Sequence, residues 1–257
     1  MRRVCLLLVL AFLATGCEVP PTPDTPVSYR LETDPASGRA FFLYVPSTYR
    51  EDRAVPVVIT CHGTPPFDVA EHHIREWKWY GEQNGMIVIA PTLEATDGIL
   101  GDGPLVGMIA NERYILSILS SLSYRYNIDR ANVMIDGFSG GGFPAYWVGL
   151  RHPDIFSCVS ARNCNFSEGN LDGWYPPEAT TVNVLVLFGE NDPGAIVHQS
   201  QNAIRYLASR GFTVEKLMVP GLGHQRRPDL AVEFFRRHFR PSRPSFPAGA
   251  RTASYMD

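Results

Sequence analysis

The sequence predicts an α/β protein with one mostly parallel sheet of about eight strands and helices on both faces. Short apolar runs alternate with longer amphipathic segments along the chain, which is typical of parallel crossover units. Several runs, such as Val55–Cys61, are almost continuously apolar, as expected of strands covered on both faces. The length of 257 residues and the hydrophobic content of 45% are sufficient for the core of a single domain.

The strands follow from apolar runs bounded by turn residues. The first two are separated by the turn-rich segment 34–38, and the later ones alternate with helical segments. The predicted strands span residues 28–32, 39–45, 55–61, 86–90, a run ending at Asp136, 156–161, 184–188 and 213–219.

The helices follow from apolar residues at helical spacing. Residues 68–84 place Ile74 and Trp77 on one face, and residues 109–126 repeat the pattern after a glycine-rich stretch that we interpret as a loop. Glycine or proline ends two of the others, at Gly211 and Pro153. The remaining predicted helices span residues 140–151, 197–210 and 229–239.

The N-terminus has the pattern of an export signal. Arg2 and Arg3 precede an apolar run, Val4 to Leu13, that is too short to form a stable membrane span, and small residues then lead to Cys17. Leu13-Ala14-Thr15-Gly16-Cys17 resembles the lipobox of bacterial lipoproteins. We therefore expect residues 1–16 to be a signal peptide and Cys17 to carry lipid, so that the protein is anchored to a membrane in the periplasm or at the cell surface. The alternative is an ordinary secretory signal that leaves Cys17 as a free thiol.

Composition also defines the ends of the domain. Residues 17–27 are proline-rich and predict an extended tether, residues 28–240 the folded domain, and residues 241–257 a disordered tail. Binding to a nucleic acid needs clustered lysine and arginine side chains, and a formal net charge of −3 gives no reason to expect them. We therefore expect no nucleic-acid partner.

The cysteines leave one question open. Cys61, Cys158 and Cys164 remain after the signal, and three thiols cannot all pair within one chain. Cys158 and Cys164 are the pair closest in sequence, and either a disulfide or two buried thiols fits the spacing.

Ser139 is the candidate nucleophile. Gly137-Phe138-Ser139-Gly140-Gly141 fits the G-x-S-x-G pattern, in which a tight turn between a strand and a helix exposes the hydroxyl and leaves no room for side chains at the glycines.

A serine nucleophile needs a base and a group that orients the base. Asp192 follows one apolar strand, and His224, preceded by glycines 221 and 223, follows the next, which gives the chain order Ser, Asp, His. Glu190 is the rival acid, but Asp192 lies in the turn itself. For the oxyanion hole we expect the backbone N–H groups of Gly140 and Thr64.

The substrate contacts are less clearly indicated. His62, Trp174 and Tyr175 are the candidates, with the two aromatic residues walling an acyl pocket in a segment too short for a large lid. Arg162 is expected in an ion pair at the rim of the site. We interpret Glu71-His72-His73 as a solvated helix face and not as a metal site, since no further ligands cluster with it in the sequence.

Four motifs in order carry a family resemblance over about residues 38 to 239. His62-Gly63, the segment from Asn127 through the Ser139 turn, Gly189-Glu190-Asn191-Asp192 and Gly223-His224 resemble the α/β-hydrolase superfamily. More narrowly they resemble secreted esterases of the polyhydroxybutyrate-depolymerase and feruloyl-esterase type and dienelactone-hydrolase-like relatives.

The resemblance implies the α/β-hydrolase fold, a serine hydrolase acting on a small-molecule or polymer ester through an acyl-enzyme on Ser139, and no metal or organic cofactor. Two other functions remain open: a serine peptidase of the oligopeptidase kind, and a binding lipoprotein that keeps the fold without catalysis. Neither the natural substrate nor the oligomeric state follows from the sequence.

Overall fold

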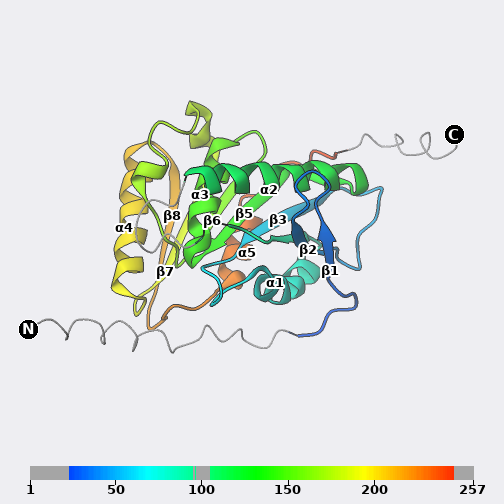
Figure 1. Ribbon diagram of the computed structural model, residues 1–257, viewed down its shortest axis with the longest axis horizontal. Helices are drawn as coiled ribbons and strands as arrows, with labels where there is room; N and C mark the ends of the chain where they lie inside the picture. Colours follow the sequence, from blue (N-terminus) through cyan, green and yellow to red (C-terminus); the bar gives the residue numbers. More distant parts are fainter. Residues whose placement is uncertain (1–22, 95, 97–104, 246–257) are drawn as a thin grey trace, which may run out of the picture.

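A computed structural model describes residues 23–94, 96 and 105–245 of the chain (Figure 1). The predicted signal peptide, residues 1–16, and the predicted lipid attachment site, Cys17, lie outside these residues. No helix of the described part is long and apolar enough to cross a membrane.

Eight strands form one sheet in the order β1-β2-β4-β3-β5-β6-β7-β8. The first two strands run antiparallel to their neighbours, and every pairing from β4 to β8 is parallel, as predicted. The strands are β1 (Arg30–Thr33), β2 (Ala40–Tyr44), β3 (Val55–Cys61), β4 (Ile87–Pro91), β5 (Ile128–Phe138), β6 (Cys158–Arg162), β7 (Asn183–Gly189) and β8 (Thr213–Val219).

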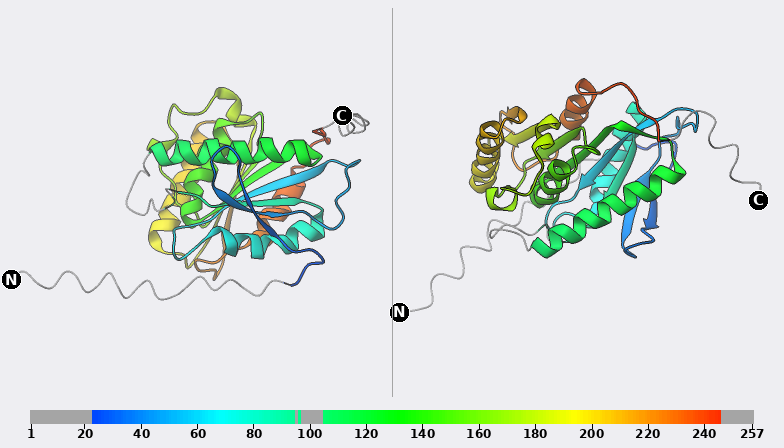
Figure 2. Two further views of the ribbon diagram at one scale, coloured as in Figure 1. Left: turned by 45° about the vertical axis from the view of Figure 1, so that its right-hand side comes forward. Right: turned by 90° about the horizontal axis from the view of Figure 1, so that it is seen from above.

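In the described residues, five α-helices cover both faces of this sheet. In the right-hand view of Figure 2, α2 and α3 lie on one side of the strands and α5 on the other. The helices are α1 (Ala70–Asn84), α2 (Leu105–Arg125), α3 (Gly142–Arg151), α4 (Gly194–Ser209) and α5 (Pro228–Arg237). Short 3-10 helices occur at Ser139–Gly141, Glu168–Asn170 and Pro177–Thr181.

The alternation of side chains along the central strands builds two cores. In β3, Val57 and Ile59 pack with residues of α2, α3 and α4, whereas Val58 packs with residues of α1 and α5. The same period of two runs through β5, where Ile135 faces the first core and Met134 the second. A strand covered on both faces must be apolar on both, which is why the sequence pattern identified these strands.

β5 is longer than the sequence predicts. It continues two residues past Asp136, because Gly137 pairs with both Cys61 of β3 and Ala161 of β6, and Phe138 pairs with Arg162. The pairing depends on neighbouring strands that are distant in sequence. As a result Ser139 follows the last strand residue directly.

Cys158 and Cys164 do not form a disulfide, because they lie in different cores. Cys61, Cys158 and Cys164 are free and buried. Cys158 packs in the core beneath α1 and α5, and Cys164 packs in the core on the opposite face of the sheet. Two thiols separated by the sheet cannot meet the distance that a disulfide requires.

The predicted tail does not begin at residue 241. The Ser245 N–H donates to the Ile128 carbonyl at 2.8 Å, and the Arg130 N–H donates to the Arg243 carbonyl at 2.8 Å. Residues 243–245 therefore pair with the first residues of β5, an interaction that composition does not reveal. Residues 246–257 lie outside the described part of the chain.

Candidate active site

Ser139 sits at a sharp turn between β5 and α3. Its φ of 53° is in the left-handed region, where a side chain is strained, and it is one of two non-glycine residues with positive φ in the described chain. A Cβ at Gly137 would collide with the Gly141 carbonyl and lie 2.9 Å from the Ala145 Cβ, and one at Gly141 would collide with the Cys61 carbonyl. The glycines of the G-x-S-x-G pattern are thus required by the close approach of the backbone around Ser139.

Replacing Gly137 with alanine should distort this turn. We expect Gly137→Ala to lower stability by about 1 to 3 kcal/mol, the usual cost of overpacking, and to reduce the reactivity of Ser139 with a fluorophosphonate probe. Thermal unfolding and probe labelling measure the two effects. Gly194→Ala is the matched control, because a Cβ at Gly194 meets nothing within 4 Å; equal behaviour of the two variants would contradict the steric argument.

Asp192 and His224 meet beyond the ends of β7 and β8. The Asp192 Oδ1 lies 2.6 Å from the His224 Nδ1. The Asp192 side chain is fully buried, whereas 24% of the His224 side chain is exposed. The buried carboxylate can hold the Nδ1 side of the ring in a fixed orientation.

Glu190, the rival acid, has a different contact. Its Oε2 accepts a hydrogen bond of 2.9 Å from the Gly221 N–H. Glu190 therefore braces the backbone of the loop that carries His224, while Asp192 contacts the imidazole.

The loop carrying His224 is also held by a residue that the sequence analysis did not select. The Asn163 Nδ2 donates to the carbonyls of Gly223 and Gln225, at 3.1 and 3.0 Å, on either side of His224. Asn163 follows β6 directly and has a φ of 51°, a conformation that asparagine tolerates better than most residues. An asparagine just past a strand end was the signal available in the sequence.

The imidazole lies beside the serine turn. The His224 ring and the ring of Phe138, the residue before Ser139, have centroids 4.8 Å apart. The loop after β3 reaches the same place, since a Cβ at Gly63 would lie 3.2 Å from the Ser139 Cβ. The structure thus places the Asp192–His224 pair next to Phe138, the residue that precedes the candidate nucleophile Ser139.

The predicted oxyanion donors are also adjacent. A Cβ at Gly140 would lie 2.8 Å from the Thr64 Oγ1, so the two residues face each other. The Gly63 N–H is already used, because it donates to the Asp68 Oδ2 at 2.7 Å. No described residue accepts a hydrogen bond from the Thr64 N–H. Gly140 is in the first turn of a short 3-10 helix, where N–H groups have no acceptor within the helix.

Solved structures share this architecture. No protein-family model matches the chain, and no curated protein matches it in sequence. A ferulic acid esterase from the anaerobic fungus Anaeromyces mucronatus superposes with a TM-score of 0.64 and 18% identity, over 86% of this chain and 94% of that one. The chain has the α/β-hydrolase fold.

Two further structures extend the comparison. An acetyl xylan esterase from Aspergillus awamori has a TM-score of 0.56 at 16% identity, over 82% of this chain and 99% of that one. A fluorophosphonate-binding serine hydrolase from Staphylococcus aureus has a TM-score of 0.59 at 14% identity, over 83% and 98%. This α/β-hydrolase domain therefore spans nearly the whole length of each of these proteins.

His62 is not available to a substrate. It is 1% exposed, its Nδ1 lies 2.8 Å from the Gly63 carbonyl, and its Nε2 accepts a hydrogen bond of 2.9 Å from the Leu93 N–H. These contacts fit a neutral ring with the proton on Nδ1, in keeping with burial, which lowers the pKa of His62. The prediction of a substrate contact is wrong, because the ring ties the loop after β3 to the loop after β4.

Trp174 and Tyr175 contact residues of α3 and α4. The Trp174 carbonyl accepts a hydrogen bond from Arg151, the last residue of α3, and the Tyr175 hydroxyl lies 3.3 Å from that of Tyr206 near the end of α4. The Trp174 ring also lies 5.9 Å from the ring of Trp147 in the middle of α3. Neither residue lines the pocket beside the serine turn, and their role as substrate contacts stays a prediction.

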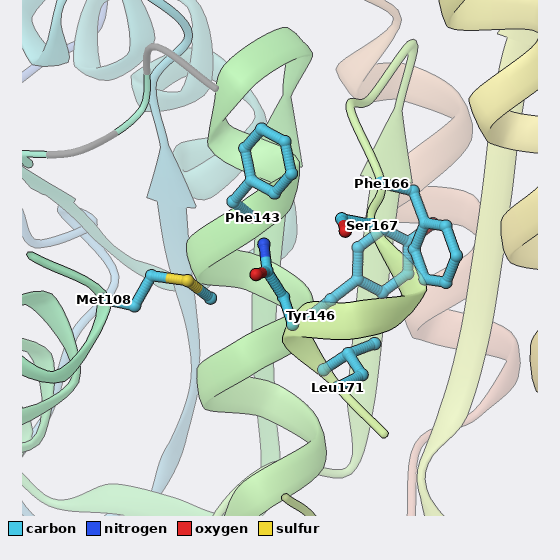
Figure 3. Close-up of a pocket in the computed structure, with 7 residues that line it drawn as sticks. Met108, Phe143, Tyr146, Phe166, Ser167 and Leu171 are labelled. Carbon is cyan, nitrogen blue, oxygen red and sulfur yellow. The ribbon is translucent and has the colours of Figure 1, made fainter. Parts of the chain in front are cut away.

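A small pocket lies beside the serine turn (Figure 3). The Asn165 N–H donates to the Ser139 carbonyl at 2.9 Å, so the segment that continues into Phe166 passes next to the nucleophile. Figure 3 shows Phe143 and Tyr146 of α3 facing this segment across the pocket. The lining residues are mostly apolar: Met108, Phe143, Tyr146, Phe166, Ser167, Asn170 and Leu171.

The sequence predicts Arg162 at the rim of the site, and this is wrong. Arg162 is completely buried at the end of β6. Its Nε and Nη2 donate to the two carboxylate oxygens of Asp136, at 2.8 and 2.7 Å, and its Nη1 lies 3.7 Å from the Glu76 Oε2. Burial raises the pKa of Glu76 to about 7, although the Arg162 charge lowers it. A strand-end position was compatible with either place, and the buried partners Asp136 of β5 and Glu76 of α1 decided it.

His73 also contradicts the expected solvated helix face. It is fully buried between α1 and the sheet, with its Nε2 2.8 Å from the Asp68 Oδ2 and its Nδ1 2.7 Å from the Thr60 Oγ1. In the described residues, no three side chains of His, Cys, Asp or Glu are grouped so that they could hold a metal ion. His73 belongs instead to a buried hydrogen-bonded network.

Proposed function

We propose that this protein is a serine hydrolase that cleaves carboxylic esters. The observation that carries the proposal is the contact of 2.6 Å between Asp192 and His224, placed next to a serine with φ of 53°. A strained serine turn alone has structural explanations. A turn that also faces an imidazole held by a buried carboxylate fits nucleophilic catalysis.

The chemistry follows from the proposed roles of the three residues. The Ser139 hydroxyl attacks the carbonyl carbon of the ester while the His224 Nε2 takes its proton, and Asp192 holds the Nδ1–H and stabilises the imidazolium. The tetrahedral intermediate collapses to an acyl-enzyme, and His224 gives the proton to the departing alcohol. Water then attacks the acyl-enzyme by the same route and releases the acid.

The negative oxygen of the intermediate needs donors that are in place beforehand. We assign this role to the N–H groups of Gly140 and Thr64, on the basis of their adjacency and of the Gly63 N–H being occupied by Asp68. Loss of one such donor typically costs about 2.7 to 4 kcal/mol of transition-state stabilisation.

A labelling experiment tests the proposal. The protein is treated with a fluorophosphonate probe, digested and mapped by mass spectrometry, and in parallel assayed with p-nitrophenyl acetate and butyrate. We expect the probe on the peptide containing Ser139 and turnover of the shorter ester at least. A protein that neither labels nor turns over either ester would support the binding-lipoprotein alternative.

Peptide bonds are the second class of substrate to assay. The same nucleophile, base and oxyanion donors suit a peptidase, and the chain has no additional domain in its described part that restricts access to Ser139. Cleavage of dipeptide amides without ester turnover would replace the esterase proposal with the peptidase one.

We also propose that the protein is exported and anchored through lipidated Cys17. The support is the order of a positive start, an apolar run and small residues before Cys17, followed by a proline-rich segment. In a bacterial host, the protein should partition into the detergent phase of Triton X-114, and Cys17→Ser should move it to the aqueous phase. Aqueous partitioning of both forms would contradict lipidation.

A further inference from the structure

Asp68 is a buried carboxylate that contacts several parts of the active site at once. It lies in the loop after β3 and its side chain is 4% exposed. Its Oδ2 accepts a hydrogen bond from the Gly63 N–H at 2.7 Å and lies 2.8 Å from the His73 Nε2. The bond from Gly63 fixes the peptide between residues 62 and 63, one peptide before the N–H of Thr64, the proposed oxyanion donor.

The other oxygen of Asp68 contacts the loop that carries His224. The Asp68 Oδ1 accepts from the Nη2 of Arg226, which lies two residues after His224. The Arg226 side chain is 1% exposed, and its guanidinium lies over the Phe138 ring at 5.1 Å. His224 packs against that same ring. One carboxylate therefore joins two loops that are 158 residues apart in the sequence.

We propose that Asp68 and Arg226 are positioning residues. They hold the loop of residues 62–68, which carries Thr64, and the loop of residues 222–226, which carries His224, in fixed positions relative to each other. This inference rests on the proposed hydrolase function, in which Thr64 and His224 act on the same intermediate. Neither Asp68 nor Arg226 is assigned a contact with the substrate.

The surroundings of Asp68 keep the carboxylate ionised and fixed. Burial alone raises the pKa of a carboxyl group, but His73, His72 and Arg226 outweigh it and hold the pKa of Asp68 well below its usual range. On the far side of His73, the Thr60 hydroxyl lies 2.7 Å from the ring and donates to Asp136 at 2.9 Å. Asp136 is in turn paired with Arg162. Asp68 is therefore linked through His73 and Thr60 to Asp136 in the centre of the sheet.

Rigid placement of both loops matters because catalysis depends on small distances. A displacement of about 1 Å at a reacting group can cost about 100-fold in rate. If Asp68 coordinates the loops, its loss should slow the chemical step more than it weakens substrate binding.

Kinetics of Asp68→Asn and Arg226→Met with p-nitrophenyl acetate test this. We expect kcat to fall by about 10- to 100-fold in each variant, with KM changed by less than about threefold. Arg226→Lys keeps the charge but offers a single donor site, and it should restore part of kcat. The double variant should cost little more than one single variant, because both remove the same link.

The neighbouring exposed pair supplies the matched control. Arg227 and Asp229 form an ion pair whose side chains are 33% and 42% exposed. Arg227→Met and Asp229→Asn should change kcat by less than about twofold. The inference is overturned if Asp68→Asn or Arg226→Met raises KM alone, if their losses multiply in the double variant, or if the control pair gives equal losses.

Amide hydrogen exchange provides a measurement that does not depend on enzyme activity. Asp68→Asn should speed exchange severalfold both in its own loop, residues 62–68, and in residues 222–226. Faster exchange confined to residues 62–68 would overturn the coupling, whatever the protein hydrolyses. Should Asp68→Asn fail to fold, hydrogen exchange is measured in Arg226→Lys instead. Faster exchange in residues 62–68, the loop that does not carry the substitution, is then expected, and unchanged exchange there would overturn the coupling.

Discussion

Ser139→Ala should lower kcat for p-nitrophenyl acetate by at least about 10⁴-fold and abolish labelling by a fluorophosphonate. The acyl-enzyme needs an oxygen nucleophile at this position, and removing the serine of such a site typically costs as much as removing the whole catalytic group. The remaining rate should still exceed that in water, because the proposed oxyanion donors are unchanged. Initial rates and in-gel fluorescence measure the two effects.

The control for this variant is another serine on the same domain. Ser209→Ala removes an exposed hydroxyl at the end of α4, which donates only to the Tyr206 carbonyl. We expect its activity to match that of the unmodified protein. Equal turnover by Ser139→Ala would rule out Ser139 as the nucleophile.

Asp192→Asn should reduce kcat by about 10³- to 10⁴-fold without unfolding the protein. A carboxylate accepts the Nδ1–H of His224, whereas a carboxamide can turn its NH₂ to the ring and stabilise the tautomer that cannot take the serine proton. The amide is nearly the same size as the carboxyl group, so the turn after β7 should keep its shape. Steady-state kinetics and a thermal melt separate the loss of activity from a loss of fold.

Glu190→Gln is the matched variant for Asp192→Asn. Its amide oxygen can still accept the Gly221 N–H, and Glu190 has no contact with the imidazole in the described chain. We expect the loss of kcat to stay below about fivefold, within the effect of one exposed hydrogen bond. A larger loss from Glu190→Gln than from Asp192→Asn would reverse the assignment of the acid.

Ser139, Asp192 and His224 could be selected as candidates from the sequence because each follows a strand that its own residues specify. In each case a near-continuous apolar run ends, glycines or a turn residue follow, and the candidate side chain lies in that turn. The carboxyl ends of parallel strands then meet along one edge of the sheet, so order in the chain was enough to predict proximity. Thr64 and Gly63, the two candidates for the second oxyanion donor, both lie in the loop after β3.

Other residues could be placed only by the tertiary structure. Arg162 is of a residue type that usually stays at the surface, and its burial depends on a partner from another strand, Asp136. His73 is buried against Thr60 of β3 as well as Asp68. Trp174 and Tyr175 have the composition of a pocket wall, but their hydrogen bonds are with Arg151 at the end of α3 and with Tyr206 of α4.

The sequence by itself determined the alternation of strands and helices and the chemistry at the strand ends, because periodicity and turn formation are local properties. Only the tertiary structure decided which charges are buried together and which loops touch. Ion pairs such as Asp68 with Arg226 join residues far apart in the chain, and no local pattern records the packing that brings them into contact.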